Sequence, residues 1–128
     1  MPRQKKNEGL RREERLRKKT DFETIAKEGI RSHTENFLII ARKNERGFSR
    51  MGAVASKKVG KAVERNRVKR LMREFFRRNK DRLPPSTDYV FVGKKGAQNL
   101  HYAQVVNELN ALTKLRMEHG QRSGNASL

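Results

Sequence analysis

The segment 61–79 constrains the fold most strongly, because its large apolar side chains recur at the spacing of one helix face. They occupy positions i, i+3, i+4, i+7 and i+8, namely Val68, Leu71, Met72, Phe75 and Phe76. This period predicts a long amphipathic helix whose apolar stripe is buried against the rest of the domain. Pro84 and Pro85 prevent the helix from continuing, since proline lacks a backbone N–H and its ring clashes with the preceding turn.

Shorter apolar runs on both sides of this segment predict a sheet and one further helix. Residues 37–41 form an unbroken run rich in strand-forming side chains, and a second run follows the turn-like residues 44–47. The predicted strands are 30–34, at an edge, and 37–41, 51–55 and 89–92. Apolar residues at helical spacing through 100–115 predict a helix after the last strand.

A first helix is predicted to begin at Thr20. Thr20 and Glu23 have capping-box spacing, in which each side chain accepts a hydrogen bond from the other residue's backbone N–H. The apolar stripe of this helix would consist of Phe22, Ile25 and Ala26. Gly29 is placed to end the helix in a left-handed conformation, which glycine adopts without steric cost.

These elements predict an α+β fold, a small sandwich with a central sheet covered by helices, in the order α-β-β-β-α-β-α. A chain of 128 residues suits a single core, and we expect one RNA-binding domain at 15–117. Residues 1–14 are rich in basic and poor in large apolar side chains, which predicts a mobile basic arm. Residues 118–128 are expected to form a frayed tail.

The overall charge points to a polyanionic partner. Thirty-two Lys and Arg against 14 Asp and Glu give a net charge of +18, typical of proteins that bind nucleic acid. The chain has no cysteine, so disulfides and thiolate zinc sites are excluded. Its apolar runs are too short for a membrane span or a signal peptide. We therefore expect a cytoplasmic protein with no membrane partner.

Basic side chains concentrate on the predicted helix and just after it. Residues 61–82 contain ten basic and three acidic side chains, an excess of seven positive charges. The polar side chains opposite the apolar stripe of this helix are Asn66, Arg70, Arg73 and Arg77. Arg67 and Arg78 lie on one flank of that side and Lys69 on the other. Arginine binds phosphate oxygens bidentately, so this side predicts RNA binding with steep salt dependence. An ordinary solvated face is less favoured, because few acidic partners lie within reach on the helix.

Three further basic residues extend this surface. Lys57 and Lys58 lie just before the helix, where backbone N–H groups also attract phosphate. Arg65 falls near the edge of the apolar stripe, so two placements stay open for it. Its guanidinium either faces RNA, or its stem packs on the core while its head pairs with an acid.

No constellation of catalytic or metal-binding residues is evident in the sequence. His33, His101 and His119 fall in separate segments, without the spacing of a metal site or of a general acid and base. The glycines at 93 and 96 lack the spacing of a phosphate-binding loop. We expect no catalytic residue, no metal bound by the protein itself and no small-molecule substrate.

Residues 55–75 closely resemble the bacterial ribonuclease P protein family. The part most like its signature is the triplet Arg65-Asn66-Arg67 followed by Lys69-Arg70. The resemblance continues through Asp21, Phe22 and Gly29 and through the predicted strand 89–92, so it covers about residues 15–115. The block as a whole is specific, whereas the triplet alone would be a weak signal.

This resemblance implies a protein subunit of a ribonucleoprotein endonuclease that processes tRNA, with hydrolysis performed by an RNA subunit and its Mg²⁺ ions. Its partners would be ribonuclease P RNA and precursor tRNA. The implied fold is like the second domain of ribosomal protein S5, with an unusual left-handed crossover between parallel strands. The residues carried over as RNA contacts are Arg65, Asn66, Arg67, Lys69, Arg70 and Arg73.

The resemblance also implies a cleft for the single-stranded 5′ leader of precursor tRNA, lined by Phe22 and Phe37. Unpaired bases stack on aromatic rings, while nearby cations follow the backbone. From spacing alone Phe22 is better explained as a core residue of the first helix. Family members often carry a second aromatic residue four positions later, where this chain has Ala26.

A ribosomal or other structural RNA-binding protein and a protein-only nuclease are the competing functions.

Overall fold

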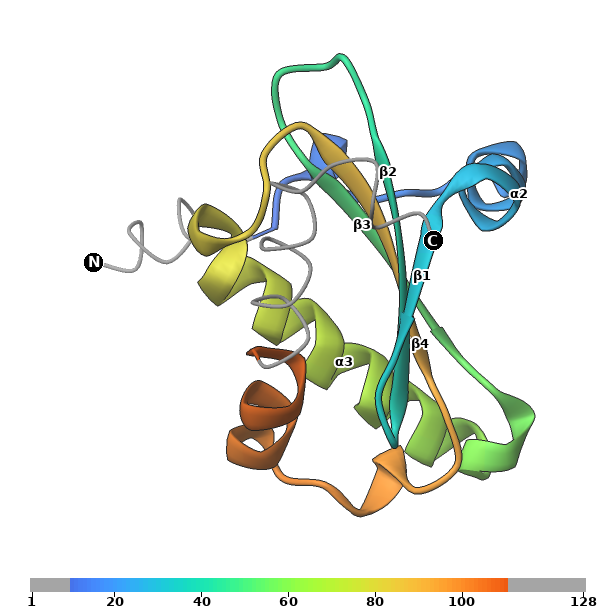
Figure 1. Cartoon of the computed structure of the whole chain (residues 1–128). Helices are drawn as coiled ribbons and strands as arrows, with labels where there is room; N and C mark the ends of the chain where they lie inside the picture. The colour runs from blue at the N-terminus through green and yellow to red at the C-terminus, as the bar shows by residue number, and fades with distance from the viewer. Residues whose placement is uncertain (1–9, 111–128) are drawn as a thin grey trace.

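A four-stranded mixed sheet lies between helices on its two faces (Figure 1). The computed structural model describes residues 10–110. The strands are β1 (Ile30–His33), β2 (Phe37–Lys43), β3 (Arg50–Ala55) and β4 (Thr87–Gly93). They lie in the order β1-β2-β4-β3, with β4 antiparallel to β2 and parallel to β3. All four predicted strands are confirmed.

The helices and strands follow one another in the order that the sequence predicts. The two long ones are α2 (Lys19–Glu28) and α3 (Ala62–Asn79), and a further helix occupies 102–110. The connections contain three short 3-10 turns, η2 (Lys57–Val59), η3 (Lys80–Arg82) and η4 (Ala97–Asn99). A further 3-10 turn, η1 (Arg12–Glu14), precedes α2. The order α-β-β-β-α-β-α is confirmed, including a parallel pair, β3 and β4, joined through α3. The predicted end of the last helix, at 111–115, lies outside the described residues.

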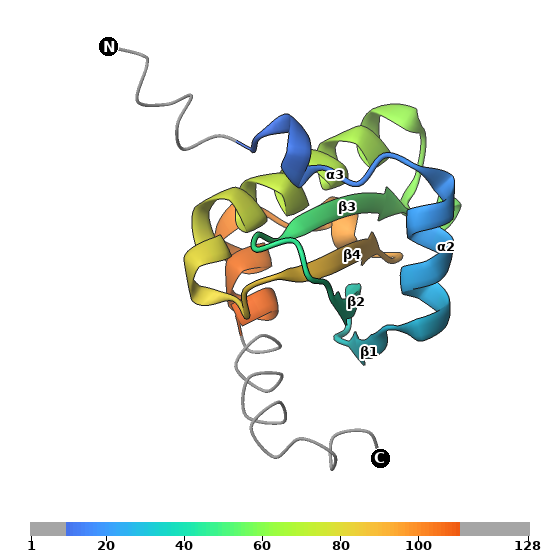
Figure 2. The same cartoon turned by 90° about the horizontal axis from the view of Figure 1, so that it is seen from above.

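The two faces of the sheet are covered unequally. On one face α3 and the helix at 102–110 bury a large core, in which Val68, Met72, Phe75 and Phe76 are fully buried. Ring contacts join the two phenylalanines of α3 to Tyr89 and Phe91 of β4. The opposite face carries α2, which runs across the strands from β3 towards β1 (Figure 2), over a smaller cluster. That cluster consists of Leu16, Ile25, Ile40 and Val90.

The predicted capping box at the start of α2 is wrong. The helix begins one residue earlier, and its N-cap is Lys18, whose side chain makes no capping hydrogen bond. The chain entering the helix is already held by the sheet, since the Leu16 N–H donates to the Met51 carbonyl at 2.9 Å. This tertiary contact places the first turn and overrides the local Thr20 to Glu23 pattern.

The predicted left-handed conformation of Gly29 is also wrong, since its φ is −79°. Glycine is needed there for close approach instead. A Cβ at this position would lie 2.7 Å from both the Ile25 carbonyl oxygen and Cγ2 of Ile40. The end of α2 therefore packs directly on β2.

Part of the predicted N-terminal arm belongs to the folded domain. Leu10 packs against the core on the α3 side, and Glu14 is buried. The Glu14 carboxylate accepts two hydrogen bonds from Lys80 Nζ, at 2.9 and 3.0 Å, which pin this segment to the end of α3. Residues 10–14 thus precede the predicted domain start at 15, whereas 1–9 and the predicted tail at 118–128 lie outside the described residues.

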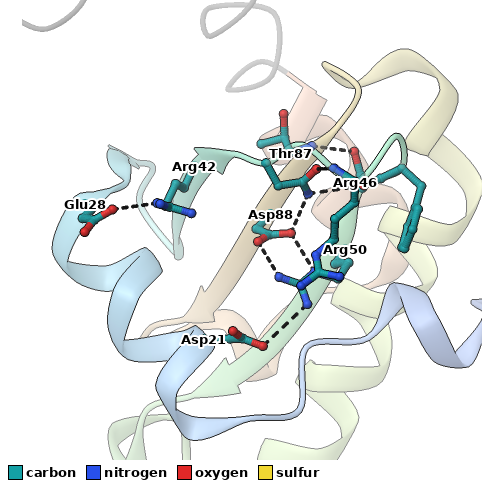
Figure 3. Close-up of polar contacts among 10 residues, drawn as sticks. Asp21, Glu28, Arg42, Arg46, Arg50, Thr87 and Asp88 are labelled. Carbon is teal, nitrogen blue, oxygen red and sulfur yellow. Dashed lines mark hydrogen bonds and ion pairs between the residues drawn. The ribbon is translucent and has the colours of Figure 1, made fainter.

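A buried ionic group sits where β3 and β4 pair (Figure 3). Arg50 Nε and Nη2 donate to the two oxygens of Asp88 at 2.9 and 2.7 Å, and Asn44 Nδ2 donates to Asp88 at 2.8 Å. Burial disfavours the charged form of Asp88, yet the hydrogen bonds from Arg50 and Asn44 outweigh burial and hold its pKa below the ordinary value. The pair therefore favours the folded state wherever Asp88 is ionised.

We predict that Asp88→Asn lowers the free energy of unfolding at pH 7 by about 3–5 kcal/mol, because it removes the carboxylate that binds the buried Arg50 guanidinium through two nitrogens and leaves the more distant Asp21 as its charged partner. Glu28→Gln, which breaks the exposed pair with Arg42, is the control and should cost about 0.5 kcal/mol. Urea unfolding measures both.

The same pair makes stability depend on pH. Because the pKa of Asp88 is depressed in the fold, its contribution is complete above the unfolded pKa of about 3.9 and disappears as the pH falls through the folded pKa. The stability difference between the native chain and Asp88→Asn should therefore shrink below about pH 4. A difference that stays constant from pH 7 to pH 3 would contradict this account.

Candidate nucleic-acid interface

The side of α3 that faces away from the sheet presents unpaired polar side chains. Asn66 and Arg70 are exposed and Lys69 is half-buried. Among residues 10–110, none of these three has a hydrogen-bond or ion-pair partner. A charged side chain without an internal partner remains available to phosphate oxygens. Asn66 and Arg70 are two of the residues that the helical period places on this side, and Lys69 is predicted on its flank.

The two arginines of the triplet are engaged with the backbone. Arg65 Nη1 donates to the Gly60 carbonyl at 2.6 Å, which closes the loop before α3. Arg67 donates to the carbonyls of Gln98 and Leu100 at 3.1 and 2.8 Å. Arg67 therefore ties α3 to the chain that leads into the last helix. Its predicted contact with RNA stays a prediction, and so does that of Arg65.

Farther along α3 the charges are arranged differently from the helical projection. Arg77, placed opposite the apolar stripe by the sequence, is half-buried and pairs with Glu74, as does Arg78. Hydrogen bonds from Arg77, and then from Arg78, lower the pKa of Glu74. Arg78 also lies over the Tyr102 ring, 5.5 Å from its centroid. The positive charge in this last turn is thus largely compensated within the protein.

Arg73 turns toward the N-terminal segment. Burial lowers its pKa, and the nearby positive charge of Arg15 lowers it further. Both guanidinium groups line a hollow of about 260 Å³ at the β3 edge of the sheet. Its other lining residues are Leu16, Arg17, Phe22, Met51, Gly52 and Ala53. Three arginines and one aromatic ring thus share one concavity.

Lys57 and Lys58 lie in η2, between β3 and α3, and both are exposed. The Ser56 hydroxyl accepts a hydrogen bond from the Lys58 N–H at 3.1 Å, which shapes this turn. Gly60, with φ of 144°, then redirects the chain into α3. The two lysines extend the basic surface around the N-terminal end of α3.

On the α2 face, one row of side chains across the sheet stays partly exposed at the margin of the cluster beneath α2. Cross-strand partners project to the same face, so the strand register places four residues in this row. They are His33, Leu38, Val92 and Val54, in the order of the strands. Val54 is 38% exposed, and Leu38 and Val92 are half-buried. We call this row the apolar strip.

Cations flank both ends of the apolar strip. At the β1 end, Lys94 Nζ lies 3.5 Å from His33 Nδ1. At the β3 end lies the hollow with Arg15, Arg17 and Arg73. An apolar surface between positive ends suits an unpaired nucleic-acid strand, whose bases are apolar on their faces and whose phosphates are anionic.

The two phenylalanines predicted to line a leader cleft lie on opposite faces of the sheet. Phe22 is half-buried on α2 and lines the hollow, with its ring against β3. Phe37 is fully buried in the core under α3, so its predicted place in the cleft is wrong. The run 37–41 has no polar alternation that would reveal its facing. Leu38, one residue later, faces the strip instead.

Acidic and histidine side chains are dispersed in the described part of the chain. Among residues 10–110, no group of three or more His, Cys, Asp or Glu side chains is close enough to hold a metal ion. Asp21 and Asp88 are both engaged with Arg50. The site is therefore built from cations, one aromatic ring and an apolar row.

Comparison with known sequences gives a consistent result. The family model described as Ribonuclease P matches residues 10–116. A "Ribonuclease P protein component" from Syntrophus aciditrophicus is 45% identical over 103 residues, covering 80% of this chain and 87% of that protein. A protein with the same description from Thermotoga maritima is 46% identical over 88 residues, covering 69% of this chain and 75% of that protein.

Solved structures show the same similarity. The RNase P protein of Staphylococcus aureus superposes with a TM-score of 0.74 at 31% identity, covering 80% of this chain and 94% of that one. The RNase P protein from Thermotoga maritima gives a TM-score of 0.71 at 40% identity, with coverages of 79% and 96%. The arrangement of strands and helices described above is therefore shared with these proteins.

The hydrogen bonds of the triplet predict a separation between stability and RNA binding. Arg67→Ala should lower the free energy of unfolding by about 2 kcal/mol, because it removes charged donors from two carbonyls. Arg70→Ala should change stability by less than about 0.5 kcal/mol, because its side chain is exposed and unpaired. It should instead weaken binding to a structured RNA and reduce the salt slope by about one.

Urea unfolding and binding titrations at several salt concentrations measure these effects. Equal loss of stability in both variants would contradict the assignment of Arg67. Unchanged RNA affinity in Arg70→Ala would place the contact surface elsewhere.

Proposed function

This chain belongs to the ribonuclease P protein family, and we propose on that premise that it is the protein subunit of a ribonucleoprotein that removes the 5′ leader from precursor tRNA. The observation that carries the proposal is the pairing of two distinct surfaces. One is the unpaired polar side of α3, with Asn66, Lys69 and Arg70. The other is the apolar strip with Phe22 and flanking cations.

The α3 side binds the RNA subunit. Its cations neutralise phosphates and release condensed counterions, so the affinity is strong and depends on salt. Lys57 and Lys58 add to this contact beside the start of α3. Mg²⁺ ions held by the RNA subunit supply the hydrolytic chemistry. The protein supports that chemistry by reducing repulsion between RNA phosphates, so less Mg²⁺ is required.

The apolar strip binds the single-stranded 5′ leader. Three inter-strand spacings of about 4.8 Å make the row roughly 14 Å long. Bases lie on Leu38, Val92 and Val54 and stack on the Phe22 ring, while phosphates contact the arginines of the hollow and Lys94. Such contacts recognise the unpaired state of the leader, with little dependence on its sequence.

The complex works in the cytoplasm, with two RNA partners and no small-molecule substrate. No helix in the described residues has the length and apolar character needed to cross a membrane. The net charge of +18 matches the polyanionic partners.

Reconstitution tests the proposed function. The purified chain alone should not cleave precursor tRNA, because its basic surfaces bind RNA and its acids are dispersed. Added to a bacterial ribonuclease P RNA at low Mg²⁺, it should increase cleavage, and the gain should grow with leader length. Cleavage without RNA would indicate a protein-only nuclease, and a gain independent of the leader would indicate a general RNA-binding protein.

Phe22→Ala tests the leader contact within the same assay. Loss of a stacking ring is expected to weaken binding of a long-leader substrate about tenfold, and to leave a substrate with a one-nucleotide leader unchanged. Phe48→Ala is the matched control, because Phe48 is exposed in the connection between β2 and β3 and lines a separate hollow with Arg11 and Lys80. Equal effects of the two substitutions would contradict the placement of the leader.

A further inference from the structure

Helix α2 is attached to the sheet by few contacts. Of its ten residues, Ile25 is the buried one, and the cluster beneath it is small. An ion pair holds each end of the helix (Figure 3). Asp21 lies 3.5 Å from Arg50 of β3, and Glu28 lies 2.8 Å from Arg42 of β2. The position of α2 over the strands therefore depends on its two ends.

The two ion pairs differ in how firmly they are held. The side chains of Glu28 and Arg42 are 54% and 39% exposed, so solvent screens their attraction. Arg50 is 11% exposed and Asp21 30% exposed. Two of the guanidinium nitrogens of Arg50 are fixed by Asp88, and its third nitrogen, Nη1, faces Asp21. Arg50 is thus a preorganised anchor, and the attraction is stronger in this less solvated site.

Strand β3 provides both Arg50, the partner of Asp21, and Gly52, against which Phe22 packs. Arg50 and Gly52 are two positions apart on β3, so they project to the same face. The Phe22 ring lies against Gly52, where a Cβ would come 2.4 Å from Cζ of Phe22. Asp21 and Phe22 are adjacent in the chain, so the ion pair between Asp21 and Arg50 limits how far the Phe22 ring can move from Gly52.

We propose that Asp21 and Arg50 are positioning residues that hold Phe22 over Gly52 and thereby set the shape of the leader-binding surface. This inference rests on the proposed function, and adds a specific role for a pair that contacts no RNA itself. Without the pair, the first turn of α2 moves away from β3 and the ring leaves its place over Gly52, beside the apolar strip. Leader binding then weakens, while cleavage at the RNA subunit proceeds as before.

The test uses the reconstituted holoenzyme with Asp21→Asn, which removes the charge and keeps the size of the side chain. Substrates carry either a long leader or a one-nucleotide leader. The KM for the long leader should rise about three- to tenfold, with kcat within about twofold, and the short-leader substrate should be unaffected. Glu28→Gln is the matched control at the other end of α2, and both its parameters should stay within about twofold.

Two further variants separate positioning from a general loss of structure. Asp21→Glu retains the charge, so its KM for the long-leader substrate should return most of the way to the value of the unsubstituted protein. Gly52→Ala adds a Cβ that displaces the Phe22 ring from β3. It should reproduce the rise of KM for the long-leader substrate while leaving the Asp21–Arg50 pair in place. Thermal unfolding of each variant confirms that the proteins compared are folded.

The outcomes distinguish this inference from the function on which it rests. Should Phe22→Ala reduce leader binding while Asp21→Asn does not, the positioning role is overturned and the leader contact stands. Equal losses with long and short leaders in Asp21→Asn would also overturn it, because they indicate a structural defect alone. If Phe22→Ala itself shows no leader dependence, the proposed leader contact fails, and the positioning role fails with it.

Discussion

The placement of β4 between β2 and β3 is the constraint on which two surfaces depend, the outer polar side of α3 and the apolar strip. Six of its seven residues are buried, so nearly every side chain of this strand must find a partner inside the protein. Tyr89 and Phe91 pack against α3, whereas Asp88, Val90 and Val92 project to the α2 face. The buried carboxylate of Asp88 is tolerated because Arg50 and Asn44 hydrogen-bond to it. One strand thereby organises an apolar face and an ionic anchor.

The two faces of the sheet present different surfaces for physical reasons. Helix α3 buries its apolar stripe in the larger core, and the side that faces away from the sheet carries Asn66, Lys69 and Arg70. Helix α2 is short and crosses the strands, so it cannot cover the whole opposite face. The row beside it has three aliphatic members, Leu38, Val92 and Val54, and lies next to the buried Ile40 and Val90. A basic helix face and a partly exposed apolar strip therefore coexist in one small domain.

Sequence periodicity predicts the elements well and their tertiary contacts poorly. The 3.6-residue period of 61–79 identifies α3 and its exposed side, because helical spacing depends on neighbouring residues alone. The partners of Arg67 are carbonyls 31 and 33 residues away, and Arg50 and Asp88 are 38 residues apart. The family resemblance places Phe37 in the cleft, and the unbroken apolar run 37–41 has no alternation that would show its facing. The strip residues were missed for the same reason, and the strand register reveals them.

The most direct test of the account is to map which RNA lies near each surface in the assembled complex. The chain contains no cysteine, so single cysteines introduced as Arg70→Cys and Val54→Cys can each carry an iron chelate that generates hydroxyl radicals. We predict that radicals from position 70 cleave the RNA subunit and that radicals from position 54 cleave the leader of precursor tRNA. Cleavage of the leader from position 70, or an RNA subunit left intact by it, would contradict the account.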